Sequence, residues 1–337
     1  MQPAFEMADV LQAHLPAVQD GGRFNTWQLR TLDAVKRCRT ASLGSHIDGC
    51  TSCGQLCISY NSCRNRHCPK CQGTAREKWI QAREEEVLPV PYFHVVFTLP
   101  DTLNKLCLYK PKVLYDLLFR TAWSVLNTFG KDHKWLGAQT GMISILHTWG
   151  QTITLHPHLH CIVPGGGLTK RGKWKTARTG PQRVVEYLGR YTHKIAMSNH
   201  RIQNIENGKV IFSYKDYKHG SVKKSMSVEG IEFIRRYGHH ILPKGFVRIR
   251  HYGICSSGSK VKSALVIKAQ LPLQMARPFG VTTKAAPEPY NSLQCPCCKK
   301  EAMETLMRFN RRGPPANWKE LATDLLAAMK ALNIETV

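Results

Sequence analysis

A short segment near the middle of the chain combines a strand pattern with paired histidines. Residues 154–166 read TLHPHLHCIVPGG. Because side chains alternate between the two faces of a strand, His158 and His160 are expected on one face, and Leu159 and Cys161 on the other. Two imidazoles on one face can hold a metal ion whose far side stays open. Imidazole pairs also occur as hydrogen-bonded core or surface groups, so the surrounding sequence has to decide between the two interpretations.

The chain contains 13 cysteines, many of them in pairs with the spacing of metal ligands. Cys50 and Cys53 form one C-x2-C pair, and Cys68 and Cys71 form another. Two such pairs at this separation are typical of ribbon-like sites in which four thiolates bind one Zn²⁺. We therefore predict a structural zinc ion held by these four residues. Three further residues lie between the two pairs: Cys57, Cys63 and His67. They could replace one of the four ligands, belong to a second site or pack around the first site.

A further cysteine motif, CPCC, occupies residues 295–298. It resembles half of a zinc ribbon, but the sequence offers it no clear partner pair. Cys255 or His251 would complete it, and an unligated or intermolecular site fits the pattern equally. The sequence leaves the role of this motif open.

The charge balance indicates an anionic partner. The chain has 48 lysines and arginines against 23 aspartates and glutamates, which gives a formal net charge of +25. Such a surplus attracts polyanions by counterion release and favours nucleic acid as the partner. We find neither a basic amphipathic helix nor a lipidation signal, long apolar run or secretion signal, so we expect a cytoplasmic protein without a membrane partner.

Hydrophobic periodicity predicts an α+β chain. The expected helices cover residues 5–40, 73–87, 104–129, 181–197 and 315–337. The expected strands cover residues 92–99, 142–147, 158–163 and 246–253, with a hairpin of residues 201–205 and 209–214. This order resembles a split βαβ, ferredoxin-like arrangement with a central antiparallel sheet and helices packed on one side. We divide the chain into a helical zinc-binding module (1–90), a sheet domain (91–225) and a basic C-terminal region ending in a helix (226–337).

The helix expected after the histidine strand carries two tyrosines. Tyr187 and Tyr191 are four residues apart and therefore lie on one helix face, one turn from each other. A phenolate on that face can attack a phosphodiester and form a covalent phosphotyrosine. The alternative is ordinary aromatic packing, because Val184, Leu188 and Ile195 share the same face.

Taken together, these motifs resemble a known family. The motif HLH at residues 158–160, followed by Tyr187 and Tyr191, resembles the HUH nucleases. The longer phrases TLHPHLHCIVPGGGL, EYLGRYTHKIAMSNHRI and YNSCRNRHCPKCQG are similar to those of the two-tyrosine, rolling-circle transposases of the insertion sequence ninety-one (IS91) family, which are related to Helitrons. The similarity runs over residues 11–252, so the central domain is expected to be an HUH nuclease.

This resemblance implies cleavage and transfer of single-stranded DNA at transposon ends and target sites. It assigns Mg²⁺ or Mn²⁺ to His158 and His160, and it makes Tyr187 or Tyr191 the nucleophile that leaves a 5′-phosphotyrosine and a free 3′-hydroxyl. The second tyrosine then serves a second cleavage or strand transfer. A third protein ligand is also expected by analogy; Gln151 ranks first among the candidates, and His156 and His94 are the others. The expected location is the bacterial cytoplasm, in association with the nucleoid.

Basic residues around this centre form the expected path for unpaired DNA. Tyr214 and Tyr217 offer rings on which bases can stack. A solvated surface is the alternative for any single basic residue. The residues predicted to contact DNA are Arg64, Arg66, Lys194, Lys215, Lys218, Lys223 and Lys224.

Two other functions fit the same residues. A replication initiator or relaxase uses the same nicking reaction for a different purpose. A noncatalytic zinc-containing DNA-binding protein would use the histidines and tyrosines for structure only. The connection between Trp174 and Tyr187 is shorter than in the relatives considered, so metal-centred nicking is a firmer expectation than complete transposition.

Overall fold

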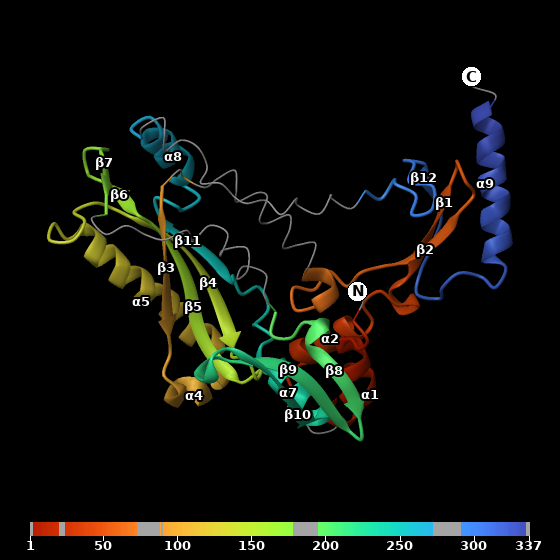
Figure 1. Ribbon diagram of the computed structural model, residues 1–337, viewed down its shortest axis with the longest axis horizontal. Helices are drawn as coiled ribbons and strands as arrows, with labels where there is room; N and C mark the ends of the chain where they lie inside the picture. Colours follow the sequence, from red (N-terminus) through yellow and green to blue (C-terminus); the bar gives the residue numbers. More distant parts are fainter. Residues whose placement is uncertain are drawn as a thin grey trace.

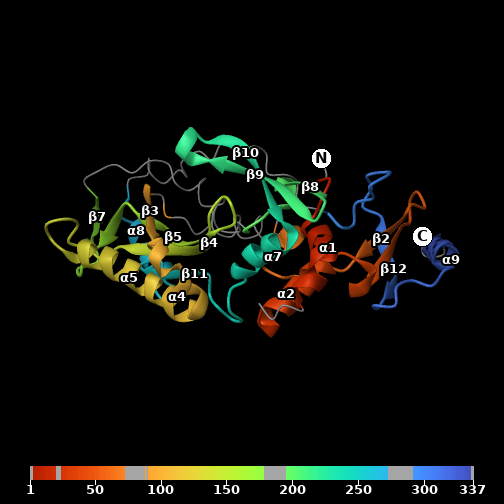
Figure 2. The ribbon, with the colours of Figure 1, turned by 90° about the horizontal axis from the view of Figure 1, so that it is seen from below.

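The computed structural model describes residues 3–19, 24–72, 88, 90–177, 195–271 and 291–334. Their helices and strands gather in three units, each built on an antiparallel sheet (Figure 1). Seen from below, the three units lie in a row (Figure 2). The mixed α+β class is therefore confirmed. The helix expected at residues 73–87 and most of that expected at residues 181–197 lie outside the described residues.

The largest sheet contains four strands that the hydrophobic pattern predicts. They are β3 (Tyr92–Thr98), β4 (Gly141–Trp149), β5 (Leu155–Pro164) and β11 (Ile249–Gly253). Their order is β11-β4-β5-β3, and every neighbouring pair is antiparallel. A small hairpin, formed by β6 (Gly166–Leu168) and β7 (Trp174–Thr176), follows β5.

One face of this sheet is covered by α4 (Asn104–Tyr109) and α5 (Pro111–Lys131). The single helix expected over residues 104–129 is divided at Lys110, whose φ of −128° and ψ of 59° are not helical. Proline has a fixed φ and no amide hydrogen, so Pro111 opens a new helix instead of continuing the old one. Buried residues between these helices and the sheet are Tyr115, Phe119, Met142, Leu146, Leu159 and Cys161.

The opposite face is covered by α8 (Lys260–Lys268). Ile145, Ile162 and Ile267 are buried between this helix and the sheet. The prediction of helices on one side only is therefore wrong. Because both faces of β4 and β5 carry apolar side chains, each face needs its own cover.

The second unit packs three helices against a three-stranded sheet. Its elements are α1 (Met7–Gln19), α2 (Thr26–Lys36), β8 (Ile202–Glu206), β9 (Lys209–Asp216), β10 (Val222–Glu229) and α7 (Gly230–His239). The predicted hairpin is confirmed as β8 and β9, and its two turn residues, Asn207 and Gly208, have the positive φ values of 48° and 74° that such turns require. β8, β9 and β10 form a sheet of their own, separate from the largest sheet. The apolar face of this sheet packs on α1 and α7 through Leu11, Phe212 and Phe233.

The third unit joins residues from both ends of the chain. Its sheet has the order β12-β1-β2, with β1 (Ser45–Cys50), β2 (Leu56–Tyr60) and β12 (Met303–Phe309). The predicted terminal helix is α9 (Trp318–Ile334), which packs on this sheet. The domain boundaries predicted at residues 90 and 225 therefore place β1 and β2 in one domain and β12 in another, although these three strands form one sheet. Among the described residues, none of the helices has both the length and the apolar character needed to cross a membrane.

Candidate functional site

Three imidazoles meet near one end of the largest sheet. His147 comes from β4, whereas His158 and His160 come from β5, and one ring nitrogen of each lies within 4.8 Å of the others. His147 is directly opposite His158 in the register of the two strands. Strand alternation keeps His160 on the same face, in phase with the buried Ile162. His147 and His160 are only 2% and 8% exposed, so the group lies at the margin of the core.

Hydrogen bonds orient the two rings of β5 so that the same nitrogen of each points inward. His158 Nδ1 donates to the carbonyl oxygen of His156 at 2.7 Å, and His160 Nδ1 lies 2.9 Å from Nε2 of His94. The Nε2 atoms of His158 and His160 then face each other at 3.2 Å. Two nitrogens that share one ion at about 2.1 Å are roughly 3.0–3.4 Å apart. The pair therefore has the geometry of a metal site.

The donor atoms of this group fit a divalent transition ion. Imidazole nitrogen binds transition ions better than it binds Mg²⁺, which prefers oxygen. Of the two ions implied by the resemblance, Mn²⁺ is the better match to three nitrogen ligands. Burial lowers the pKa of His94, which keeps this ring neutral as the hydrogen-bond partner of His160.

The third imidazole of this group belongs to His147, whereas the sequence pattern favoured Gln151 as the third ligand. The Gln151 amide is directed toward the end of β9: its Nε2 donates to Tyr217 Oη at 3.3 Å, and its Oε1 accepts from the Lys215 amide at 3.5 Å. The first-ranked ligand, Gln151, stays a prediction; in the structure, the third imidazole beside His158 and His160 is His147. The reason is the pairing of β4 with β5, which brings His147 opposite His158.

The two lower-ranked candidates also stand apart from the inward-facing nitrogens. The ring of His156 lies 3.8 Å from the Asp101 carboxylate, and its carbonyl rather than its ring supports the site. His94 contacts the Nδ1 side of His160, away from the Nε2 atom that faces His158. It therefore positions a ligand instead of serving as one.

The predicted nucleophiles, Tyr187 and Tyr191, lie outside the described residues, and so does Lys194. The described chain leaves the largest sheet after β7 and resumes at residue 195. Ala196 and Met197 are then buried in the core of the second unit. The roles of the two tyrosines stay predictions.

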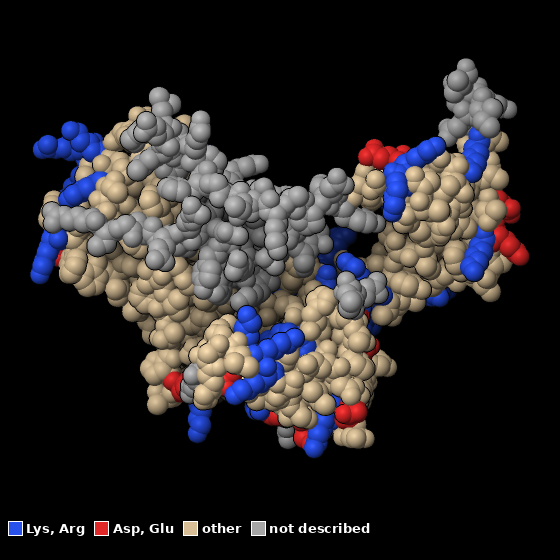
Figure 3. Space-filling view, viewed as in Figure 1, with Lys and Arg blue, Asp and Glu red and all other residues tan. Residues whose placement is uncertain are grey.

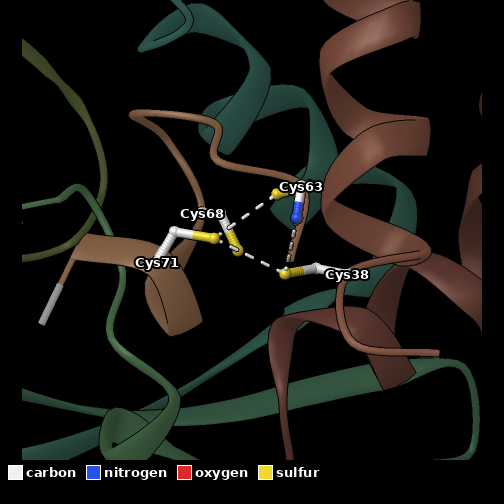
Figure 4. A group of neighbouring side chains, drawn as sticks. All are labelled: Cys38, Cys63, Cys68 and Cys71. Atoms are coloured by element: carbon white, nitrogen blue, oxygen red, sulfur yellow. Dashed lines mark hydrogen bonds between the residues drawn. The ribbon is translucent and has the colours of Figure 1, made fainter. Parts of the chain in front are cut away.

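Four cysteines gather at a second centre, between α2 and the loop after β2 (Figure 4). Cys38 Sγ and Cys63 Sγ lie 3.6 and 3.7 Å from Cys71 Sγ, and Cys68 completes the group. Thiolates around one zinc ion at about 2.3 Å are roughly 3.8 Å apart. Hydrogen bonds from Cys63 and then Cys68 lower the pKa of the Cys38 thiol to about 7, which favours its thiolate form. The group therefore fits a structural Zn²⁺.

Cys50 and Cys53 are not part of this centre, so the predicted grouping with Cys68 and Cys71 is wrong. Cys38 precedes β1, whereas Cys50 lies at the far end of that strand. Six residues of β-strand span about 20 Å, which is too far for one ion. β2 then returns the chain to the first end, where Cys63 joins Cys38 in place of the expected pair.

Basic residues predicted to contact DNA gather in part at the end of the β9–β10 hairpin. Lys215 and Lys223 are exposed and directly opposite each other in the register, so their charges repel across the strands. Lys224 forms an ion pair with Asp216 at 2.8 Å. Lys218 lies in the short helix η4 (Tyr217–His219). Lysine and arginine side chains are visible over this unit in Figure 3.

The two arginines of the zinc-binding loop differ from each other. Arg64 is exposed and remains available to an anion. Arg66 instead donates to the carbonyl oxygens of Phe246 and Pro243, and burial lowers its pKa. In the structure, the Arg66 guanidinium holds the chain ahead of β11, and its contact with DNA stays a prediction.

Comparisons with known proteins cover both centres. A family model described as a transposase zinc-binding domain matches residues 10–99, which include the four-cysteine group. A model described as a putative transposase matches residues 141–182 and 176–263, which include the three histidines. The two segments of this match meet in the short connection before Tyr187.

Two relatives extend this agreement along most of the chain. A putative transposase of Sinorhizobium fredii is 35% identical, with 93% of this chain and 98% of that protein covered. The transposase for insertion sequence element IS801 of Pseudomonas savastanoi pv. phaseolicola is 27% identical, with 81% of this chain and 79% of that protein covered. No solved structure matches the chain. On these matches and the two centres, the chain belongs to the IS91 family of transposases.

Proposed function

We propose that this transposase nicks and joins single-stranded DNA by tyrosine attack, as one step of rolling-circle DNA transposition. The observation that carries the proposal is the convergence of three imidazoles from β4 and β5, with the Nε2 atoms of His158 and His160 3.2 Å apart. A structural role for three histidines does not require two inward-facing nitrogens at ligand spacing. The proposed domain is an HUH nuclease, with the four-stranded sheet as its centre.

The proposed reaction is a transesterification at a phosphodiester. The phenolic oxygen of Tyr187 or Tyr191 forms a bond to phosphorus, the bond from phosphorus to the 3′-oxygen breaks, and the phenolic proton leaves as the 3′-hydroxyl gains one. A 5′-phosphotyrosine results, and reversal with another 3′-hydroxyl rejoins the strand. A divalent ion, when bound, stabilises negative charge on the nonbridging phosphate oxygens. His147, His158 and His160 would hold that ion.

The proposed path for DNA passes over the end of the β9–β10 hairpin. Gln151, in the loop between β4 and β5, is hydrogen-bonded to Tyr217 and to the Lys215 amide, so this hairpin end adjoins the histidine end of the large sheet. Tyr217 is 63% exposed and offers a ring for base stacking. Lys215 and Lys223 supply positive charge beside it. A strand held there can present its phosphate to the three-histidine group.

The test is formation of a covalent protein–DNA adduct. The purified full-length chain is incubated with Mn²⁺ and single-stranded oligonucleotides from the ends of its own element, and the products are separated under denaturing conditions. We expect an adduct that is absent from the Tyr187→Phe, Tyr191→Phe double variant and reduced in His158→Ala. The matched control is the double variant Tyr60→Phe, Tyr109→Phe, which removes two exposed hydroxyls elsewhere and should retain the adduct.

Two outcomes would contradict the proposal in different ways. An adduct that persists in the Tyr187→Phe, Tyr191→Phe variant rejects these residues as nucleophiles. Binding without an adduct across all end sequences favours a noncatalytic DNA-binding protein. Oligonucleotides from a plasmid origin provide the third comparison, since a replication initiator or relaxase would cleave those instead. The bacterial cytoplasm, in association with the nucleoid, is the proposed location of this reaction.

A further inference from the structure

A second four-cysteine group joins distant parts of the chain. Cys50 and Cys53 lie at the turn between β1 and β2, and Cys295 and Cys298 lie ahead of β12. The four Sγ atoms are within 4.8 Å of one another. We propose that these thiolates bind a second structural Zn²⁺, which fastens residues 291–334 to the N-terminal hairpin.

The sulfur spacing fits an ion and not a pair of disulfides. Cys50 Sγ lies 3.6 Å from Cys298 Sγ, and Cys53 Sγ lies 3.6 Å from Cys295 Sγ. Four thiolates at about 2.3 Å from one zinc ion are roughly 3.8 Å apart, whereas a disulfide needs about 2.05 Å. Thiolate is also the ligand type that selects zinc over hard cations.

The two halves of the group have the same backbone construction. In the first half, the amide of Gly54 donates to the Cys50 carbonyl at 2.9 Å, and Gly54 has a φ of 81°. In the second half, the amide of Lys299 donates to the Cys295 carbonyl at 3.0 Å, and Lys299 has a φ of 62°. A left-handed residue thus follows the last cysteine of each turn.

Each turn also has an amide contact to the sulfur of its first cysteine, from a different position in the two turns. The Cys53 amide lies 3.4 Å from Cys50 Sγ, and the Cys297 amide lies 3.4 Å from Cys295 Sγ. Amide donors of this kind stabilise a thiolate. Each turn is therefore built to present a pair of thiolates to one ion.

Strand pairing brings the halves together independently of any ion. Cys50 is opposite Met303 in the β1–β12 register, and the Thr51 amide donates to the Ala302 carbonyl at 2.8 Å. The core at this end is small and consists mostly of cysteine: Cys50, Cys295 and Met303, with Cys57, Cys298 and Ala302 partly buried. So little apolar volume gives weak stabilisation, which small ribbons supplement with metal.

This site gives the chain an unusual connectivity. The whole of the largest sheet, together with β8, β9, β10 and α7 of the helical unit, is inserted in sequence between the two halves of one zinc ribbon. The inference does not depend on the proposed nicking reaction, because the four cysteines form a group separate from the three histidines.

The test measures bound zinc and thiol reactivity in the full-length protein. We expect two zinc ions per chain in the wild type and one in the Cys295→Ser, Cys298→Ser double variant. Cys297→Ser is the matched control: Cys297 is exposed, its sulfur is not in the group, and the variant should keep both ions. Mass spectrometry after alkylation should show Cys50 and Cys53 protected in the wild type and modified in the double variant.

The alkylation pattern of the wild type keeps the proposal testable even where a variant fails to fold. Modification of Cys50, Cys53, Cys295 and Cys298 at the rate of Cys297, or a disulfide between any of them, overturns the second site. So does a zinc content of one ion per chain in the wild type. Modification of all four together after a chelator removes the metal, with protection beforehand, supports it.

Discussion

Replacing two lysines of the β9–β10 hairpin tests the proposed DNA path in a quantitative way. In the Lys215→Gln, Lys223→Gln double variant, two opposed charges are removed while a polar, somewhat shorter side chain stays at each position. For single-stranded nucleic acid, the logarithm of the binding constant falls with the logarithm of the salt concentration by about 0.7 for each phosphate that the protein neutralises. If each lysine contacts one phosphate, the slope becomes shallower by about 1.4. The affinity lost in the variant is then about sevenfold larger at ~50 mM salt than at ~200 mM salt.

The same double variant should bind DNA more weakly without losing stability. Like charges directly opposite each other destabilise a pair of strands by a few tenths of a kcal/mol, so their removal should leave the free energy of unfolding unchanged or slightly raised. The assay is fluorescence anisotropy of a labelled single-stranded oligonucleotide over a series of salt concentrations, with urea unfolding measured in parallel. Weaker binding with unaltered stability separates a lost DNA contact from a damaged fold.

Lys209→Gln is the control, compared with Lys215→Gln alone. Lys209 lies in the same strand and is exposed, but it is six residues, or about 20 Å, from Lys215 and lies 3.7 Å from the Glu229 carboxylate. An equal change of slope in the two single variants would mean that the whole hairpin attracts DNA through its net charge. An unchanged slope in the double variant would refute the proposed path.

Three further predictions concern the site and the fold. His147→Ala should reduce the Mn²⁺-dependent adduct as His158→Ala does, while Gln151→Ala should retain it; the reverse order in the adduct assay would restore Gln151 as the ligand. Burial lowers the pKa of His240 to about 4 from the ordinary 6.5, so the unfolded chain takes up the proton first as the pH falls. The free energy of unfolding should therefore decrease by up to roughly 3 kcal/mol between pH 6.5 and pH 4. A free energy of unfolding, measured in urea, that stays constant over this interval would contradict the prediction. Gly253→Ala should lower the free energy of unfolding by about 1–3 kcal/mol, because Gly253 has a φ of 57° and a Cβ there would lie 2.1 Å from a carbonyl oxygen. Gly258→Ala is the control: a Cβ at Gly258 meets nothing within 4 Å, so this variant should unfold like the wild type.

The histidine centre shows what a strand pattern can and cannot predict. The alternation of residues 158–163 was sufficient to put His158 and His160 on one face, and the structure confirms that face. His147 lies at the end of a segment also predicted to be extended, in phase with Ile143 and Ile145. What the sequence did not contain was the register that sets His147 against His158, because register depends on contacts between strands.

The cysteines were misassigned for a related reason. Spacing along the chain identifies pairs, but a hairpin decides which pairs meet, and β1 with β2 carries Cys50 away from Cys38 while returning Cys63 to it. The partners of Cys50 and Cys53 are more than 240 residues away, at Cys295 and Cys298. Local sequence reasoning therefore identified the ligand types and the zinc chemistry, whereas the grouping followed from long-range strand pairing.

The zinc-binding loop and the histidine centre are linked by a continuous set of contacts. Arg66 of the loop holds the carbonyl oxygens of residues 243 and 246. The chain then reaches Arg248, whose guanidinium lies 5.3 Å from the Trp149 ring, and Trp149 stacks on His147 at 4.8 Å. Because this stack contributes to the orientation of His147, loss of zinc from the Cys38 group should disturb the three-histidine group as well as the N-terminal unit. The zinc-binding domain then supports the largest sheet in addition to any contact it makes with DNA.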